Sequence, residues 1–413
     1  MKKIIICLTM ALVAWCAHGQ HLAVDQAKKA ISGLTMTVDS YDKAFAKLKP
    51  ALTNDETRNR AETWMLANRI KLEQYDKYVD NRRVGKKVDV KAMNHTLIDA
   101  YDYSLIALKL DTIHILDKKG QPEIDKKTKR PKVRTKYSKD VINRLVEHLG
   151  SYRLAGSELY NIKDWEGAYK AWEYYCRMAA RSDDPRWAQP DSLVAEVRYY
   201  QGITAWQMTD TIDAVRLFSM ARNGGYSRKE AYDYALVCLS DLGNEAEVVR
   251  LAWEAFIKFG TADPQYIRIL INDFITREDY SGANDLIDDA LEANPDDDEL
   301  LNLKGLVIES KETIYEALPY YQRCIELNDS NASGLFNVGR YFYNKAQETR
   351  QRSNLYGKRL ADLVNPIYRE ALPYLEKSYA INPRNVELVN ALRDIYYKLG
   401  EAEKLQAIES SIP

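Results

Sequence analysis

The chain has 413 residues, of which 46% are hydrophobic and 29% are charged, a balance that excludes an intrinsically disordered protein. Its 18 glycines and 12 prolines are too few for a turn-dense all-β protein of this length. The net charge is −1, but residues 20–150 hold 27 Lys/Arg and 18 Asp/Glu, whereas residues 151–413 hold 30 and 42. The chain is therefore basic in its first part and acidic in the rest, which bears on its partners rather than on its fold.

The first 19 residues have the pattern of a secretory signal peptide. Two lysines are followed by an apolar run of 13 residues, Ile4–Cys16, which is shorter than the ~20 residues that span a bilayer. We expect cleavage between Gly19 and Gln20 and an exported protein, located in the periplasm, at the outer membrane or outside the cell. An uncleaved anchor or a buried core helix is the alternative. Trp15 stands where a lipoprotein needs a small residue, which argues against lipid attachment.

Residues 20–139 are predicted to form degenerate helical repeats. Residues 41–53 fit the second helix of one pair, and the segment around Trp64 fits the first helix of the next. A further helix face has residues at four-then-three spacing, Ala100, Ser104 and Ala107.

A basic segment closes this region at Asp117–Lys139, with ten Lys/Arg against three acids. Gly120, Pro122 and Pro131 exclude a continuous helix, so a long loop or a loose hairpin is expected. A solvated mobile loop and a binding arm for an acidic partner or an anionic lipid surface are both open. The candidate residues of this basic loop are Lys126, Lys127, Lys129, Arg130, Lys132 and Arg134.

Residues 140–413 show a 34-residue period. Gly305 and Gly339 are 34 residues apart in similar contexts, and the stretch 316–320 recurs at 370–374 after a 20-residue insertion near 343–366. Several segments keep a four-then-three spacing: Ala168-Trp172-Tyr175, Ala214-Phe218-Ala221, Ala283-Ile287-Ala290 and Ala317-Tyr321-Cys324. Residues at this spacing share one helix face, and small residues there let two helices approach closely. The predicted helix pairs are 149–180, 195–227, 229–260, 264–295, 298–330, 332–383 and a capping repeat at 386–411.

These residues resemble the tetratricopeptide repeat family, with Gly in the first helix, Ala-aromatic-Ala in the second and Pro at the end of the unit. The resemblance implies an all-α protein, an α-solenoid with a right-handed superhelix of stacked helix pairs. It extends to exported repeat proteins of Gram-negative bacteria and covers most of the chain after the signal peptide.

The sequence offers little chemistry. His21, His95, His114 and His148 are not at metal-ligand spacing, and no HExxH, CxxC, GxSxG or GxxxxGK[ST] motif is present. We therefore expect no enzyme, no cofactor and no metal site, with an unrecognised catalytic site as the remaining alternative. Asp and Glu at 278–299 are interpreted as helix-capping and solvated acids rather than a calcium loop.

The leading hypothesis is a scaffold or adaptor of the cell envelope that binds protein or peptide segments in its concave groove. A glycan-binding envelope protein with tyrosine platforms is the alternative, and nucleic acid is not expected. Counting by helical spacing, the outward face of the first helices holds the candidate groove residues: Arg153, Tyr160, Tyr199, Trp206, Arg268, Asn272, Asn302, Arg340, Tyr343, Asn390 and Tyr397. Their types can bond a peptide backbone, hold carboxylates and bury apolar area. For Tyr199 and Trp206, packing between neighbouring helices is the alternative.

Export is expected to remove residues 1–19. Mass spectrometry of the protein purified from the cell envelope should find Gln20 as the first residue. A protein that still begins at Met1 would contradict cleavage.

Overall fold

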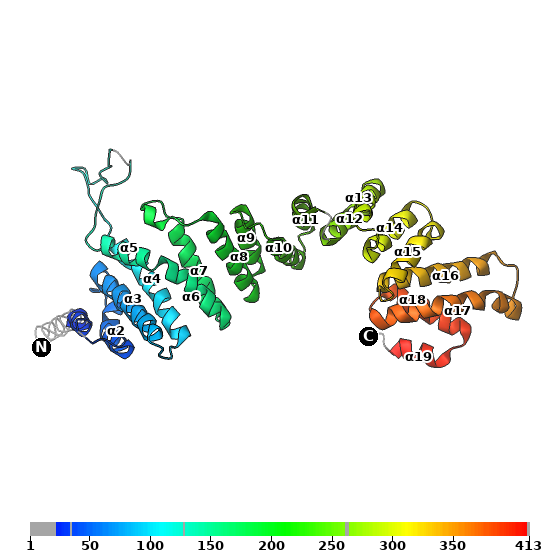
Figure 1. Ribbon diagram of the computed structural model, residues 1–413, viewed down its shortest axis with the longest axis horizontal. Helices are drawn as coiled ribbons and strands as arrows, with labels where there is room; N and C mark the ends of the chain where they lie inside the picture. The colour runs from blue at the N-terminus through cyan, green and yellow to red at the C-terminus, as the bar shows by residue number, and fades with distance from the viewer. Residues whose placement is uncertain (1–21, 34, 127–128, 261–263, 411–413) are drawn as a thin grey trace, which may run out of the picture. The chain divides into compact units, whose positions relative to one another are not determined.

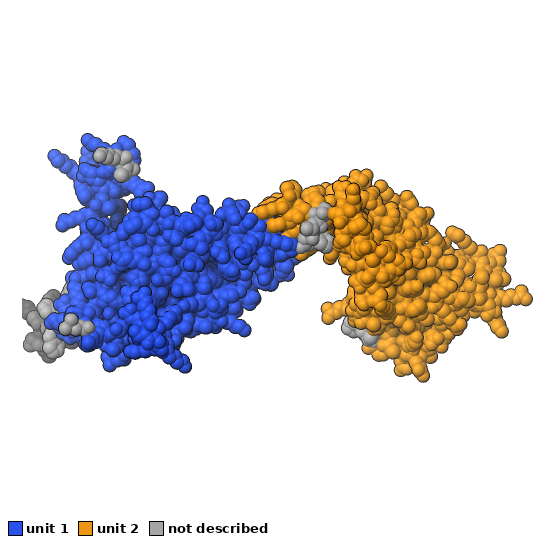
Figure 2. Space-filling model, in the orientation of Figure 1, with its two compact units in different colours: residues 1–242 blue, residues 243–413 orange. Residues whose placement is uncertain are grey.

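The computed structural model describes residues 22–33, 35–126, 129–260 and 264–410. The predicted signal peptide with its cleavage site, and Lys127 of the basic loop, lie outside the described residues. The described residues are mostly helical, with one two-stranded sheet among them, which confirms the predicted all-α fold. They divide into two compact units between Leu242 and Gly243 (Figure 2), and each unit is described by itself.

Unit 1 begins with a helix at 22–30. Its other elements are α2 (Val38–Thr53), α3 (Ala61–Arg83), α4 (Val90–Asp111), β1 (Ile113–His114), β2 (Val133–Arg134), α5 (Ser138–Glu147), α6 (Leu149–Asn161), α7 (Trp165–Ala179), a 3-10 turn (Pro185–Trp187), α8 (Asp191–Gln207), α9 (Thr211–Asn223) and α10 (Glu230–Asp241) (Figure 1). Successive helices pack on one another, and one apolar core continues from Leu72 to Val197. The boundary expected at residue 139 therefore lies within a continuous core.

Unit 2 contains only helices among its described residues. They are α11 (Glu245–Phe259), α12 (Pro264–Thr276), α13 (Tyr280–Ala293), α14 (Asp298–Lys311), α15 (Ile314–Leu327), α16 (Ala332–Arg352), α17 (Gly357–Ile381), α18 (Val386–Leu399) and α19 (Ala402–Ser410) (Figure 1). The insertion near 343–366 lies in the second half of α16 and the first half of α17, which are 21 and 25 residues long.

A close contact between a glycine and a large side chain joins the helices of four pairs. Gly156 lies under Trp172, Gly202 under Phe218, Gly305 under Tyr321 and Gly339 under Leu375. A methyl group at Gly156 or Gly305 would lie 2.3 Å from the nearest ring atom, nearer than such atoms can approach. The first three contacts join residues 16 apart in sequence, and the fourth joins residues 36 apart because of the 20-residue insertion. The fixed spacing within these pairs thus has a packing cause.

The turn between the helices of a pair also repeats. The residues Lys163, Thr209, Gly243 and Glu278 all have left-handed backbones, with φ between 58° and 65°. The next residue is Asp or Asn in each case, and its side chain accepts a hydrogen bond from the backbone N–H three residues on, which caps the second helix. The same turn therefore forms from different residues.

The helix pair predicted at 229–260 is divided between the units. Helix α10 belongs to unit 1, where it packs on α9, and α11 belongs to unit 2, where it packs on α12. One repeat after Gly202 and Phe218 the chain has Leu236 and Ala252, so this pair lacks the glycine–aromatic contact.

The three described cysteines are free and buried, as the sequence predicts for small apolar side chains. Burial raises the pKa of Cys176 and Cys324 to about 12 and that of Cys238 to about 11. Such thiols are poor nucleophiles at neutral pH.

The basic segment forms a projecting hairpin, which we call the arm and define as residues 112–136 (Figure 1). Strands β1 and β2 pair antiparallel at its base. Asp111, at the end of α4, fixes this base: its carboxylate accepts hydrogen bonds from the backbone N–H groups of Lys136, Tyr137 and Ser138 and from the Ser138 hydroxyl, at 2.7–3.0 Å. Burial would raise the pKa of Asp111, but these hydrogen bonds outweigh it and hold the pKa below its usual range.

The Gly156→Ala substitution should destabilise unit 1, because its new methyl group would collide with the Trp172 ring. We expect a loss of about 1–3 kcal/mol in the free energy of unfolding, measured by urea denaturation. Gly150→Ala is the matched control on the same helix, where a methyl group meets no atom within 4 Å. It should be neutral or stabilise by up to about 1 kcal/mol. Equal effects of the two substitutions on the free energy of unfolding would contradict a packing role for the contact between Gly156 and Trp172.

The Asp111→Asn substitution should loosen the arm, because an amide brings N–H donors where backbone N–H groups already point. We expect a cost of about 1.5–3 kcal/mol and faster trypsin cleavage within 112–136. Asp140→Asn, an exposed acid two residues into α5, should stay within about 0.5 kcal/mol of the parent.

The lowered pKa of Asp111 determines how the stabilisation by its carboxylate hydrogen bonds depends on pH. Its stabilisation is fully present above the unfolded pKa of about 3.9 and is lost as the pH falls through the lower folded value. The difference between parent and Asp111→Asn should therefore shrink in acid, and a constant difference down to the folded pKa would contradict this assignment.

Candidate functional site

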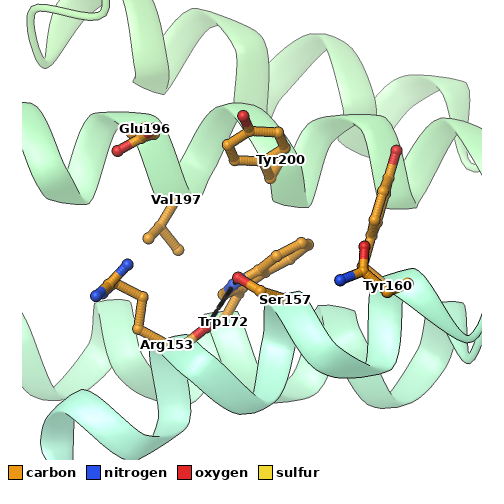
Figure 3. A pocket seen from close by; sticks show the side chains of 8 residues that line it. Arg153, Ser157, Tyr160, Trp172, Glu196, Val197 and Tyr200 are labelled. Atoms are coloured by element: carbon orange, nitrogen blue, oxygen red, sulfur yellow. Dashed lines mark hydrogen bonds between the residues drawn. The ribbon is translucent and has the colours of Figure 1, made fainter.

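A cleft in unit 1 lies between the first helices of two successive pairs, α6 and α8, and we call it the α6–α8 cleft (Figure 3). Its volume is about 350 Å³. It is lined by Arg153, Ser157, Tyr160, Asn161, Trp172, Glu196, Val197 and Tyr200.

Helix spacing brings these side chains to the cleft. Arg153, Ser157 and Tyr160 lie four and then three residues apart, so they share one face of α6. Glu196 and Tyr200 are four residues apart on α8 and face them. Trp172 of α7 forms the floor between the two helices (Figure 3).

The floor is fixed by the repeat packing. Trp172 is buried against Gly156, and its indole N–H donates a hydrogen bond of 3.2 Å to the backbone carbonyl of Arg153. The tryptophan has no further hydrogen-bond donor. It therefore offers the cleft an apolar ring surface.

Two tyrosines form an aromatic wall. The Tyr160 ring lies edge-on to Trp165 at 5.1 Å, and the Tyr200 ring lies 6.0 Å from Trp172 between ring centroids. Tyr160 and Tyr200 are 6.5 Å apart with an angle of 67° between their planes, so they form a corner rather than a flat surface. Tyr200 is 36% exposed and half-buried Tyr160 has a pKa raised by burial.

Two charges of opposite sign lie on the two helices of the cleft. Within the part of the chain that the structure describes, neither the Arg153 guanidinium nor the Glu196 carboxylate makes a hydrogen bond or an ion pair. By contrast, Arg198, two residues from Glu196, pairs with Glu173 at 2.5 Å. The cleft thus combines an apolar floor with one available cation and one available anion.

The structure brings two predicted groove residues of unit 1, Arg153 and Tyr160, into this cleft. The prediction that Tyr199 faces outward is wrong, because its ring is buried and stacks on Tyr226 at 4.5 Å. Trp206 is half-buried beside Tyr234, at 5.5 Å, and is also outside the cleft. Both side chains point to the neighbouring helix α10.

Six lining residues are not among the predicted groove residues: Ser157, Asn161, Trp172, Glu196, Val197 and Tyr200. Ser157 and Asn161 could have been predicted from their spacing, because they lie on the same face of α6 as Arg153 and Tyr160. Those on α8 were missed because counting from the apolar positions selected Tyr199 and Trp206, whose rings lie against Tyr234 of α10.

In unit 2 several predicted groove residues are used in internal contacts. Asn302 is largely buried and accepts a hydrogen bond from the Asn337 amide. Arg340 makes two hydrogen bonds of 2.7 Å to the carboxylate of Glu309. Tyr343 donates a hydrogen bond to Asp394.

The other predicted groove residues of unit 2 are spread over separate helices. Asn272, Asn390 and Tyr397 are exposed, and Arg268 is half-buried with no hydrogen bond to its Nε. A second, smaller cleft of about 180 Å³ contains Asn302 and Asn337 together with Asn382 and Asn385. Of the predicted groove residues of unit 2, only Asn302 lines this second cleft.

Among the described residues, no group of three or more His, Cys, Asp and Glu side chains could hold a metal ion. A search of the same residues found no helix of the length and apolar character needed to cross a membrane.

No protein-family model matches the chain, and no curated protein matches it. Several solved structures of repeat proteins are similar. YrrB, described as a TPR protein with an unusual peptide-binding site, has 17% identity and a TM-score of 0.33, covering 48% of this chain and 91% of its own. The C-terminal part of a TPR repeat-containing protein from Cytophaga hutchinsonii has 16% identity and a TM-score of 0.41, with 62% and 93% covered. MamA has 14% identity and a TM-score of 0.34, with 47% and 94% covered.

The resemblance to the tetratricopeptide repeat rests on the features of this chain itself. Several of its helix pairs carry small residues at fixed places in the second helix, with a large side chain between them that is aromatic at Trp172, Phe218 and Tyr321. The glycine of the first helix receives the large side chain of the second in four of them. The chain is an all-α protein of stacked helix pairs, and these pairs resemble the tetratricopeptide repeat.

Proposed function

We propose that this protein is an exported scaffold that binds an extended segment of a partner protein in the α6–α8 cleft. The observation that carries the proposal is the pair of available charges, Arg153 and Glu196, beside the aromatic wall of Tyr160 and Tyr200. A buried structural contact would have paired these charges, as it does at Arg198 and Glu173.

An extended peptide fits the chemistry of the cleft. The Arg153 guanidinium can hold a carboxylate with two parallel hydrogen bonds, and Glu196 can accept from a lysine or from backbone N–H groups. Ser157 and Asn161 offer further donors and acceptors along α6. The corner of Tyr160, Tyr200 and Trp172 can bury one apolar or prolyl side chain at low entropic cost.

Glycan binding is supported less by this geometry. A sugar ring stacks on an exposed flat aromatic face, whereas Tyr160 and Tyr200 meet at 67° and Trp172 is buried. Catalysis is also not proposed, because the lining residues include no histidine or cysteine that could act as base or nucleophile. The export of the protein rests on the signal-like segment 1–19 alone.

The experiment selects ligands from a displayed library of random linear peptides with the protein and measures the affinity of the selected peptides by calorimetry. In the Arg153→Ala, Tyr200→Ala double variant the affinity should fall at least tenfold, about 1.4 kcal/mol. Both side chains are at the surface, so the free energy of unfolding should change by less than about 1 kcal/mol.

The matched control is Arg369→Ala with Tyr356→Ala, which removes the same two side-chain types from exposed positions in unit 2. It should bind the selected peptides like the parent. Equal affinities of the parent and the cleft variant would place the binding surface elsewhere, and binding to a glycan array in place of peptides would favour the alternative.

A further inference from the structure

The arm has one apolar face, which follows from its strand pairing. His114 pairs with Val133, Leu116 with Pro122, and Ile124 with Pro131. Residues that pair across strands, and residues two apart in one strand, lie on the same face of a sheet. All six side chains therefore share one face: His114, Leu116, Pro122, Ile124, Pro131 and Val133.

This apolar face is open to solvent. Leu116 is 56% exposed, Ile124 50% and Val133 43%, and both prolines are also exposed. Single exposed apolar residues are normal, but a contiguous face on a projecting element marks a contact surface. Figure 2 shows the arm standing out from the body of unit 1.

The opposite face is mixed. It carries Ile113 and Ile115, which are 62% and 40% exposed, together with Glu123 and Lys132, which form an ion pair of 2.5 Å, and Arg134, the cross-strand partner of Ile113. Of the two faces, only the first has apolar residues without Lys, Arg, Asp or Glu among them.

Cations flank the apolar face at both turns. Lys118 and Lys119 lie in the turn closed by Asp117, whose carboxylate accepts from the backbone N–H groups of Lys119 and Gln121. Lys126 and Lys129 lie in the turn between Asp125 and Arg130, where two backbone hydrogen bonds join the ends. The arm as a whole has nine Lys/Arg and three Asp/Glu. A partner that binds the arm must therefore offer both apolar groups and negative charges.

An anionic lipid bilayer fits this surface better than an acidic protein does. Residues 112–136 contain no Phe, Tyr or Trp, whereas protein interfaces obtain most of their affinity from Trp, Tyr and Arg, with Leu and Val under-represented. Aliphatic side chains that enter the acyl boundary, with lysines at the level of the phosphates, are the usual means of binding a bilayer surface. The anchor at Asp111 holds the arm away from the helices, so the face can reach a flat surface.

We propose that the arm is a membrane-docking element, which places its apolar face, including Leu116, Ile124 and Val133, in the surface of an anionic phospholipid bilayer. Lys118, Lys119, Lys126 and Lys129 contact the lipid phosphates. This site is separate from the α6–α8 cleft, and it does not depend on peptide binding there.

The test measures co-sedimentation of the whole protein with vesicles of phosphatidylcholine and phosphatidylglycerol, and with vesicles of phosphatidylcholine alone. Leu116→Ser with Ile124→Ser should lower the partition coefficient on anionic vesicles by roughly tenfold or more. Lys118→Gln with Lys119→Gln should lower it by roughly 25-fold at low salt, since each lysine near an anionic surface contributes about fivefold. The parent and all variants are used as the exported form that begins at Gln20, so the apolar segment 4–16 does not contribute to binding.

Two matched controls should bind like the parent. Ile212→Ser with Val386→Ser removes two aliphatic side chains that are exposed elsewhere, and Lys86→Gln with Lys87→Gln removes an adjacent lysine pair from another turn. Equal partitioning of the arm variants and these controls overturns the proposal, as does equal binding of the parent to neutral and anionic vesicles. Binding of poly-glutamate by the parent without vesicle binding also overturns it and assigns the arm to an acidic protein.

Discussion

This fold depends on the close contact between the two helices of a pair at a glycine of the first helix. Where Gly156, Gly202 or Gly305 receives an aromatic ring, the first and second helices of a pair come close enough to bury both apolar faces. The same contact shapes the candidate site, because the ring that fills the space over Gly156 is Trp172, the floor of the α6–α8 cleft. The repeat packing and the candidate site therefore share one residue, Trp172.

This contact also explains how much of the fold could be predicted. The pair predicted at 298–330 is found as α14 and α15, because Gly305, Tyr321 and their apolar neighbours recur at a fixed distance in sequence. The turns could not be predicted in the same way. Lys163, Thr209 and Glu278 all adopt a left-handed backbone without being the residue types that favour it, and the fixed ends of the two helices hold them there.

The candidate site was predicted only in part, since helical spacing cannot tell which polar face is covered. A helix inside a stack packs on its partner and on the next pair, so Tyr199 lies on a face that seemed outward by counting but is covered by its neighbours. Tyr200, one residue from Tyr199, faces the cleft instead. Adjacent residues of an α-helix differ in direction by about 100°. The pattern of apolar positions alone does not show which of two adjacent residues faces a neighbouring helix and which faces the cleft.

The division of the chain between α10 and α11 has a consequence for its folding thermodynamics. In repeat proteins each helix pair interacts with its neighbours only, so cooperativity depends on the interfaces between adjacent pairs. Here each of the two units has apolar clusters of its own. We therefore expect equilibrium unfolding of the whole chain to depart from a two-state process, with one cooperative transition for each unit.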